Sequence, residues 1–440
     1  MRFPIIKALS VAAAVTSAAS AQFYSPMDAR QAGMGGGATI ADFYDVYNYP
    51  ALMFEYQNNI SATVMPGGAS GGILGIKSLN DRFAVGIAAN QGLMANQGIA
   101  CLVPNTDGGF DTVAVVPSFA STAINSLNGA LPAINTLGFT FEPSNLWKTN
   151  IPHLLLGFNA GTVKLGADIF VEYSRYNNFE ETGADNGTIT DSYNGLLLNP
   201  GARLSADIDI GDIGLMTKAG LSLPSFEIKE ELSRPGAETV INSTKSDKGL
   251  YVELGAELAM PVKSFELTAG TFYIFTEHSI KNSQMSYWNS NFSLYAGGEF
   301  SFLTTAKASA KYAFSRIAGT TTTTATLNSI TYIFDEMVGF HYHSISAGME
   351  NVWDKAYFFD SVSLRAGAVY GIVDYVGNYS ENRSINKRDW KRFAEHAVIP
   401  TMGVGVTKSF LTIDLYCDIG SWNGAFTGPA VGAATATIKF

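Results

Sequence analysis

The feature that most constrains this chain is a two-residue alternation of apolar and polar side chains, which recurs from Ile60 to the C-terminus in segments of about ten residues. In residues 163–173, apolar side chains occupy every second position, and charged, aromatic or glycine residues occupy the positions between. Residues 250–258 and 411–419 repeat the pattern. Because successive residues of a strand point to opposite faces, each segment would present one apolar face and one face that can carry charge. The alternation therefore predicts an all-β chain.

A soluble sandwich alternates in the same way, so the lengths of the connections help to decide between architectures. Short connections are expected at residues 78–81, 210–213 and 260–263. Long connections are expected at residues 92–150, 176–195 and 319–335. Short turns on one rim and long loops on the other are typical of bacterial outer-membrane barrels. We therefore expect a single transmembrane antiparallel β-barrel with an even number of strands, between about 14 and 16, because residues 327–335 and 353–359 can be read either way.

Both ends of the chain carry features of an exported barrel. Residues 1–21 predict a signal peptide, with basic residues first, then a short apolar run, and small residues at the cleavage site. No cysteine follows the cut at Gln22, so lipid attachment there is not supported. The last alternating strand ends in Phe440, which resembles the signal that the barrel assembly machinery reads. We expect an outer-membrane location in a Gram-negative bacterium, with both termini in the periplasm.

Composition and charge exclude several other classes. The net charge of −10 becomes −12 when the two basic residues of the leader are removed, which argues against nucleic acid or an anionic membrane surface as partner. The chain has 44 Gly, 28 Phe and 20 Tyr, but only 15% charged residues and no Pro- or Ser-rich linker. One large β structure fits better than several soluble domains. Residues 83–105 and 112–141 have few charges, but polar residues and helix breakers interrupt them, so neither predicts a membrane helix.

Residues 25–53 are expected to fill the barrel. Their glycines at positions 33, 35, 36 and 37 suit a compact irregular segment better than a strand or helix. The predicted domains are therefore a signal peptide at 1–21, a plug at 22–57 and a barrel at 58–440. Wall glycines on the polar face would make room for the plug and allow local bending. These are Gly86, Gly166, Gly220, Gly255, Gly270, Gly297, Gly348 and Gly367.

Charged residues on the polar face of the strands would point into the lumen. They are Lys164, Asp168, Glu172, Arg203, Asp207, Lys218, Glu253, Glu257, Lys307, Lys311, Arg365, Asp414 and Asp418. The set has mixed sign, and charges in a narrow interior need partners. We expect these residues to pair with one another and with the plug residues Asp28, Arg30, Asp42 and Asp45, in preference to lining a path for charged solutes.

No motif predicts catalysis, a cofactor or a metal. Residues 68–72 match a nucleophile-elbow pattern, but they lie in a Gly-rich hairpin and are interpreted as a turn. Residues 33–38 match a loose dinucleotide pattern with no strand before it. His341 and His343 share a strand face without an obvious third ligand, so a surface or lumen pair is favoured. Cys101 and Cys417 lie far apart in the sequence, and a disulfide between them is possible but not favoured.

The long connection at 92–150 holds apolar residues at helical spacing. Phe119, Ile124, Leu127, Leu131 and Ile134 belong to this pattern, which predicts one amphipathic helix or a pair broken near Gly129 and Pro132. Such helices could capture a hydrophobic ligand or could serve as a lid over the barrel mouth. Both readings stay open.

Short motifs in the plug and in the wall resemble a known family. The run Ala29-Arg30, Gly33-Met34-Gly35-Gly36 and Asn48-Tyr49-Pro50-Ala51-Leu52 resembles the N-terminal hatch of FadL-type outer-membrane transport proteins, although Tyr49 interrupts the usual Asn-Pro-Ala. Within that superfamily, residues 77–86, 346–353 and 364–367 resemble PorV, a barrel tied to type IX secretion. The PorV-like group implies 14 strands, so we expect the lower count.

The resemblance implies two functions, neither of them enzymatic. The first is passive diffusion of fatty acids or aromatic hydrocarbons past the plug, with outer-membrane lipid around the wall. The second is a non-transporting adaptor that docks secreted proteins. The plug residues expected to matter are Asp28, Arg30, Gly33, Gly35, Gly36, Asp42, Asp45, Asn48 and Pro50.

Overall fold

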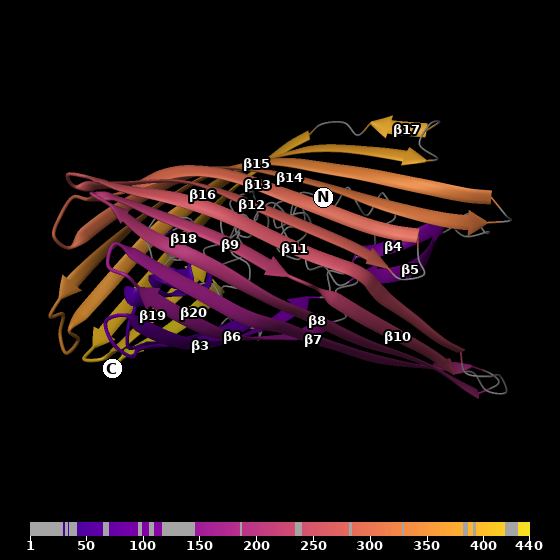
Figure 1. Cartoon of the computed structure of the whole chain (residues 1–440), viewed down its shortest axis with the longest axis horizontal. Helices are drawn as coiled ribbons and strands as arrows, with labels where there is room; N and C mark the ends of the chain where they lie inside the picture. Colours follow the sequence, from indigo (N-terminus) through magenta and orange to yellow (C-terminus); the bar gives the residue numbers. More distant parts are fainter. Residues whose placement is uncertain are drawn as a thin grey trace.

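A computed structural model describes most of the chain as one closed antiparallel barrel (Figure 1). It describes residues 30, 34, 42–64, 70–95, 99–104, 110–116, 146–184, 187–233, 240–280, 284–327, 330–381, 386–389, 393–418 and 430–440. Two short 3-10 helices come first, η1 at Phe43–Tyr47 and η2 at Pro50–Phe54. No helix among the described residues combines the length and the apolar character that a membrane-crossing helix requires.

The wall begins with five strands of unequal length. They are β1 (Asn59–Val64), β2 (Ser70–Ser78), β3 (Phe83–Ala95), β6 (Leu146–Asn159) and β7 (Val163–Ala184). The next seven are β8 (Gly187–Ile210), β9 (Ile213–Ser222), β10 (Ser225–Ser233), β11 (Val240–Val262), β12 (Phe265–Ile280), β13 (Gln284–Ser301) and β14 (Ala306–Leu327). The last six are β15 (Ile330–Asp354), β16 (Ser361–Glu381), β17 (Asn386–Asp389), β18 (Phe393–Lys408), β19 (Leu411–Asp418) and β20 (Ala430–Lys439). A separate two-stranded sheet pairs β4 (Ile99–Pro104) with β5 (Phe110–Val116).

The barrel has sixteen wall strands, so the expected count of 14 is wrong. The sheet contains 18 strand segments, but β9 and β10 both lie between β8 and β11, and β17 and β18 both pair with β16, so each pair counts as one wall strand. Pairing of β1 with β20 closes the sheet. The even number that was expected is confirmed.

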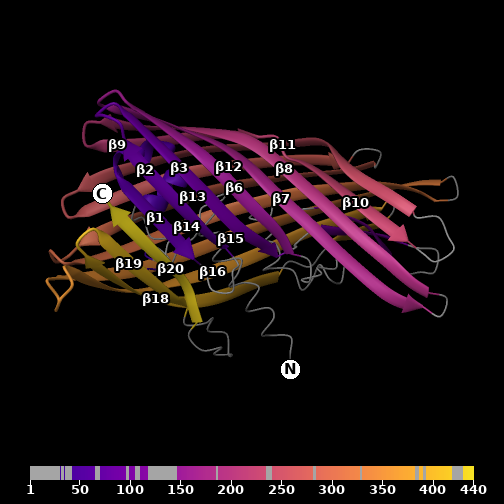
Figure 2. The ribbon, with the colours of Figure 1, turned by 90° about the horizontal axis from the view of Figure 1, so that it is seen from below.

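Two predicted long loops are in fact long hairpins. Residues 176–195 continue β7 and β8, which stay in register to Ala184 and Gly187. Residues 319–335 likewise continue β14 and β15 to Leu327 and Ile330. These hairpins extend from the end of the barrel opposite the C-terminus (Figures 1 and 2).

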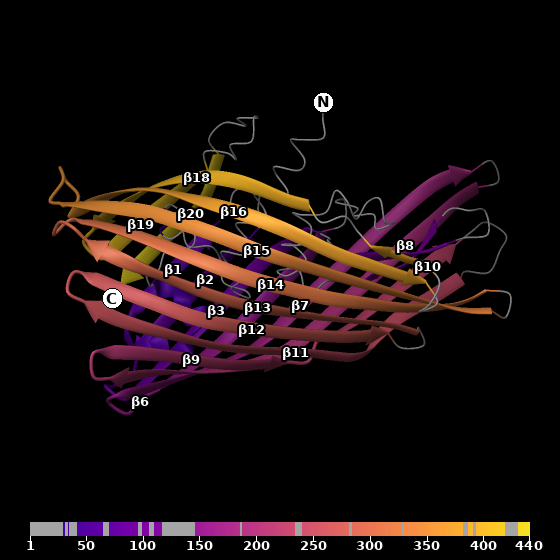
Figure 3. The ribbon, with the colours of Figure 1, turned by 90° about the horizontal axis from the view of Figure 1, so that it is seen from above.

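The tight turns lie at the same end as the C-terminus. Gly211 takes a φ of 65° in the two-residue turn between β8 and β9, where a left-handed conformation favours glycine. The expected turn at 260–263 lies slightly later, because β11 continues to Val262 and Lys263 takes the positive φ. Figure 3 shows these turns on the left, beside the C label.

The alternation separates an apolar outside from a polar inside. On the outer face, large apolar side chains are exposed, among them Ile87 at 69% and Leu204 at 63%. On the inner face, Asp168, Arg203 and Glu253 are almost completely buried. This arrangement is the reverse of that in a soluble protein. It confirms, for these strands, the prediction that the polar face points into the lumen.

Candidate functional site in the barrel lumen

Two short helices of the N-terminal segment lie inside the barrel. Asp42 begins η1, because its Oδ1 accepts a hydrogen bond from Phe43 N at 2.5 Å while Asp45 Oδ2 accepts one from Asp42 N at 2.6 Å. Tyr49 lies outside the helical region with φ −128° and ψ 83°, as expected before a proline, and Pro50 then begins η2. The sequence thus breaks the segment into two single turns that fit across the lumen.

An apolar cluster joins one side of this segment to the wall. Its ring-bearing members Phe43, Tyr44, Tyr47 and Phe54 are buried together with Val46, Leu52 and Met53. The wall contributes Leu74 and Ile76 from β2, Ala84 and Ala88 from β3, and Leu155 from β6. The inner surface of β2, β3 and β6 is therefore an apolar sector of the lumen.

A second contact fixes the segment to β7 and β8. A Cβ added at Gly166 would lie 2.1 Å from Ala51 N, so only glycine lets the helix come this close. Ala51 N donates to Ser205 Oγ at 2.7 Å, and Arg203 Nη1 donates to the carbonyl oxygen of Tyr47. Side chains and backbone of the wall thus replace the water that these polar groups would otherwise need.

Arg203 on β8 is the centre of a buried ion network that reaches β6, β7 and β11. Its guanidinium binds Glu253 and lies 3.2 Å from Asp168 Oδ2. Asp168 also accepts a hydrogen bond from His153 Nδ1 at 3.0 Å, because a carboxylate can only accept. The Tyr47 ring packs edge-on against His153, with ring centroids 5.2 Å apart. The network therefore lies directly beneath the N-terminal segment.

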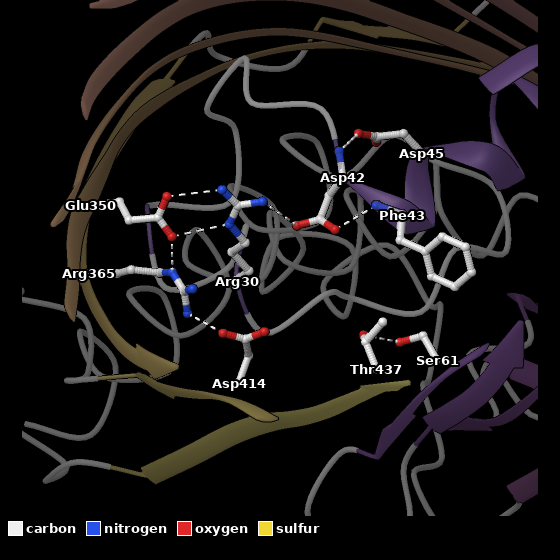
Figure 4. A network of polar contacts seen from close by, with 9 residues as sticks. All are labelled: Arg30, Asp42, Phe43, Asp45, Ser61, Glu350, Arg365, Asp414 and Thr437. Carbon is white, nitrogen blue, oxygen red and sulfur yellow. Dashed lines mark hydrogen bonds and ion pairs between the residues drawn. The ribbon is translucent and has the colours of Figure 1, made fainter. Parts of the chain in front are cut away.

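A second network holds Arg30 to the opposite wall (Figure 4). Arg30 donates twice to Glu350, through Nε at 3.1 Å and Nη2 at 2.9 Å, and its Nη1 lies 3.7 Å from Asp42 Oδ2. Glu350 also accepts from Arg365 at 2.7 Å, and Arg365 donates to Asp414 at 2.6 Å. One arginine of the segment therefore joins an ion chain that β15, β16 and β19 already complete among themselves.

Other inner charges also have partners. Lys164 donates to Asp207 at 3.0 Å and to Glu55 of the segment at 2.5 Å. Lys218 and Lys311 instead lie over aromatic rings, Lys218 Nζ 4.5 Å from Phe272 and Lys311 Nζ 4.2 Å from Tyr295. The predicted pairing of lumen charges is confirmed for the ion pairs described above, whereas Lys218 and Lys311 lie against rings instead of carboxylates. Sequence reasoning missed Glu350 and His153, although the parity of each strand places both in the lumen.

The lumen glycines serve two purposes, of which only one was predicted. Gly166 and Gly348 do make room for the N-terminal segment, since a Cβ at Gly348 would lie 2.2 Å from Met34 O. The interpretation is wrong for Gly220, Gly255 and Gly270. There a Cβ would meet side chains of neighbouring wall strands, namely Glu253, Lys218 and Tyr295.

Part of the predicted site falls within the described residues. Arg30, Asp42, Asp45, Asn48 and Pro50 lie inside the barrel, and both side-chain polar atoms of Asn48 are buried without a hydrogen-bond partner. Asp28, Gly33, Gly35 and Gly36 lie outside the described residues, as do Phe119, Ile124, Leu127, Leu131 and Ile134.

Burial of the segment affects its tyrosines. Burial first, and then the nearby carboxylate of Glu257, raises the pKa of Tyr49 above its ordinary value. Burial, with Asp42 second, raises the pKa of Tyr56. Both phenols therefore stay neutral at physiological pH, so the tyrosines add no negative charge to the lumen.

The described residues contain no cluster of metal-ligating side chains. His341 and His343 lie on the outer face of β15, since Ser344 and Ser346, which follow them at the opposite parity, are buried inside and Ile345 is 52% exposed. Cys417 is a free thiol, and the side chain of Cys101 lies outside the described part.

Comparisons with known proteins find similarity in structure only. No family model and no curated protein matches the sequence. A Pseudomonas aeruginosa FadL homologue is similar over 95% of this chain and 100% of its own, with 12% identity and a TM-score of 0.48. The CymD monoaromatic hydrocarbon channel is similar over 95% and 98%, with 9% identity and a TM-score of 0.41. CdiB from Escherichia coli is similar over 87% of this chain and 62% of its own, with 10% identity and a TM-score of 0.41.

Proposed function

We propose that this chain is an outer-membrane barrel that lets hydrophobic small molecules diffuse past an N-terminal plug. The exposed apolar outer face supports a place in lipid, because a barrel with no free sheet edge satisfies its backbone hydrogen bonds there. The tight turns and the C-terminus share one end, which we assign to the periplasm. The described segment 42–57, with Arg30 and Met34, belongs to the plug.

The apolar sector of the lumen carries the proposal. Along β2, β3 and β6, the plug meets small or apolar side chains. Gly157 of β6 lies against the Phe54 ring, and a Cβ added at Gly157 would lie 3.0 Å from that ring. Beside β7, β8 and β11, and beside β15, β16 and β19, ion pairs cross the described lumen, and a hydrophobic molecule would have to desolvate or separate them. The apolar sector therefore offers a hydrophobic molecule a favourable path between the plug and these three strands.

The contact between Arg30 and the wall is the plug contact that breaks with the smaller loss of free energy. When Arg30 departs, Glu350 keeps Arg365 as partner and Arg365 keeps Asp414, so no buried wall charge loses its last partner. The end at Tyr47 and Ala51 is held by buried hydrogen bonds and by the apolar cluster. We infer that displacement of the plug begins at Arg30, and that the route along β2, β3 and β6 opens when the helices then move off the apolar sector.

Uptake of a labelled long-chain fatty acid tests the route, with one labelled aromatic hydrocarbon as a second substrate. Ala88→Phe places a ring in the apolar sector and should lower uptake severalfold, because Ala88 is buried against the plug. Ala89→Phe is the matched control, since Ala89 is next to Ala88 on β3 but points outward. Equal uptake by both variants would contradict this route.

A non-transporting adaptor of protein secretion is the second candidate. Ion pairs join the plug to the wall on two sides, and the β7–β8 and β14–β15 hairpins project from one end as an extended surface. Both features suit a closed barrel that binds a protein at its long hairpins. Deleting the gene and comparing surface proteins alongside uptake separates the two candidates. Normal uptake with missing surface proteins would favour the adaptor, and lost uptake with a normal surface would favour the channel.

A further inference from the structure

The outer face of β14 and β15 carries three basic side chains among its apolar residues. Arg316 is exposed there, and His341 and His343 are half-buried on the same face. Their parity is set by exposed neighbours, Tyr312 at 46% and Ile345 at 52%. We call Arg316, His341 and His343 the outer basic cluster.

Neighbouring rings hold the two histidines of the outer basic cluster in place. Arg316 lies opposite His341 in the strand register, and Phe314 lies opposite His343. The Phe314 ring contacts both imidazoles, at centroid distances of 5.9 Å to His341 and 5.0 Å to His343. The Tyr312 hydroxyl lies 2.8 Å from His343 Nδ1. With the phenol as donor, the ring proton of His343 sits on Nε2, which leaves an N–H donor away from Tyr312.

The height of the cluster on the wall indicates its surroundings. Trp353 lies near the tight-turn end of β15, and His343 lies ten residues further along that strand. At about 3.3 Å per residue and a tilt of about 40°, that distance is about 25 Å along the barrel axis. An apolar belt is also about 25 Å tall. The cluster therefore lies at the upper edge of the belt, where lipid headgroups begin.

A cation facing lipid is tolerated at this edge and is stabilised if an anion lies beside it. Arginine presents paired N–H groups that match the oxygens of a phosphate, and the imidazole N–H groups add further donors. We propose that the outer basic cluster binds the phosphate of a lipid headgroup, in the leaflet on the long-hairpin side. Asp374 stands opposite His341 in the β15–β16 register, so β16 carries a negatively charged residue beside the cluster.

Lipid retention measured by native mass spectrometry tests the proposal. The full-length barrel is placed in phosphatidylcholine nanodiscs that contain either lipid A, with its phosphates, or dephosphorylated lipid A. Wild-type protein should retain the phosphorylated form at least about tenfold better, since a charge-assisted hydrogen bond changes an equilibrium by about that factor or more. Arg316→Gln should remove the preference, and Asp374→Asn should increase it.

Arg82→Gln is the matched control, because Arg82 is an exposed arginine in the β2–β3 turn at the other end. It should leave the preference intact. Heat-modifiable gel mobility shows whether Arg316→Gln folds. If it does not, the double variant His341→Gln, His343→Gln tests the same preference, which it should lower. Equal retention of the two lipids, or an equal loss in Arg82→Gln, would overturn the proposal. Displacement of lipid A by millimolar inorganic phosphate would assign the cluster to free phosphate instead of lipid.

Discussion

Gly166 gives the sharpest test of the contact between plug and wall. Replacing it with alanine would place a Cβ 2.1 Å from Ala51 N and 2.2 Å from the carbonyl carbon of Pro50. Real Cβ contacts under 3.0 Å essentially never occur, so η2 must retreat by about 1 Å or more. That movement breaks the 2.7 Å hydrogen bond from Ala51 N to Ser205.

The cost of this change follows from two terms. Losing a buried hydrogen bond costs about 1–3 kcal/mol, and overpacking a tight site costs about 1–3 kcal/mol. Together they disfavour the bound plug by about 2–6 kcal/mol, which is roughly thirtyfold or more in the ratio of displaced to bound plug. The barrel wall itself keeps its strand pairing, because alanine is tolerated in an extended backbone.

Conductance in planar lipid bilayers measures this ratio. Gly166→Ala should open far more often than wild type, and Gly214→Ala should not, because the nearest atom to a Cβ there is 3.9 Å away. Heat-modifiable gel mobility checks that both barrels are folded. Wild-type conductance from folded Gly166→Ala protein would refute the close contact between η2 and β7.

Three further predictions concern the ion pairs. Arg203→Met leaves two buried carboxylates without their cation and should lower the free energy of unfolding by about 3–5 kcal/mol in a urea titration. Arg30→Ala should lower the free energy of unfolding by only about 1 kcal/mol in the same titration, because Glu350 keeps Arg365 as a partner. The same variant should raise conductance. A loss of stability as large as that of Arg203→Met would contradict this reading. Asp360 accepts a hydrogen bond from Ser409 N, and this bond together with Lys408 holds the pKa of the Asp360 carboxyl below its ordinary value of 3.8. The interaction is therefore complete above pH 3.8 and is lost as the pH falls through the lowered pKa. Asp360→Asn should speed amide exchange at Ser409 near neutral pH, and unchanged exchange would contradict this role for Asp360.

The direction of each wall side chain could be predicted from the sequence. Whether a residue such as Asp168 or Arg203 points inward depends only on counting by two from an apolar neighbour. For the same reason the inner charges and glycines could be named in advance. The closed barrel followed from the repeated alternation and from the tight turns.

The strand count could not be predicted so well. In residues 320–324 every position is threonine, so no alternation marks the end of β14. Residues 176–195 are likewise polar on both faces. Such segments become strands through backbone pairing with a neighbour, which leaves no apolar pattern in the sequence.

The partners of the inner charges were also beyond the sequence. Parity places Arg365 in the lumen, but its binding to Glu350 and Asp414 depends on the order and register of β15, β16, β18 and β19. The purpose of Gly220 shows the same limit. It lies between Arg203 and Glu253 in the register, and their ion pair crosses above it.

This crossing makes each such glycine a check on strand register during folding. Lys218 passes over Gly255 to Phe272, and Tyr295 passes over Gly270 to Glu257. If one of these strands slipped by two residues, every apolar side chain would still face outward, so burial alone would not reject the error. A larger residue would then occupy the position of the glycine, and the long side chain would have no space to cross. Correct strand register in the closed wall thus depends on its glycines, which leave room for the side chains that cross them.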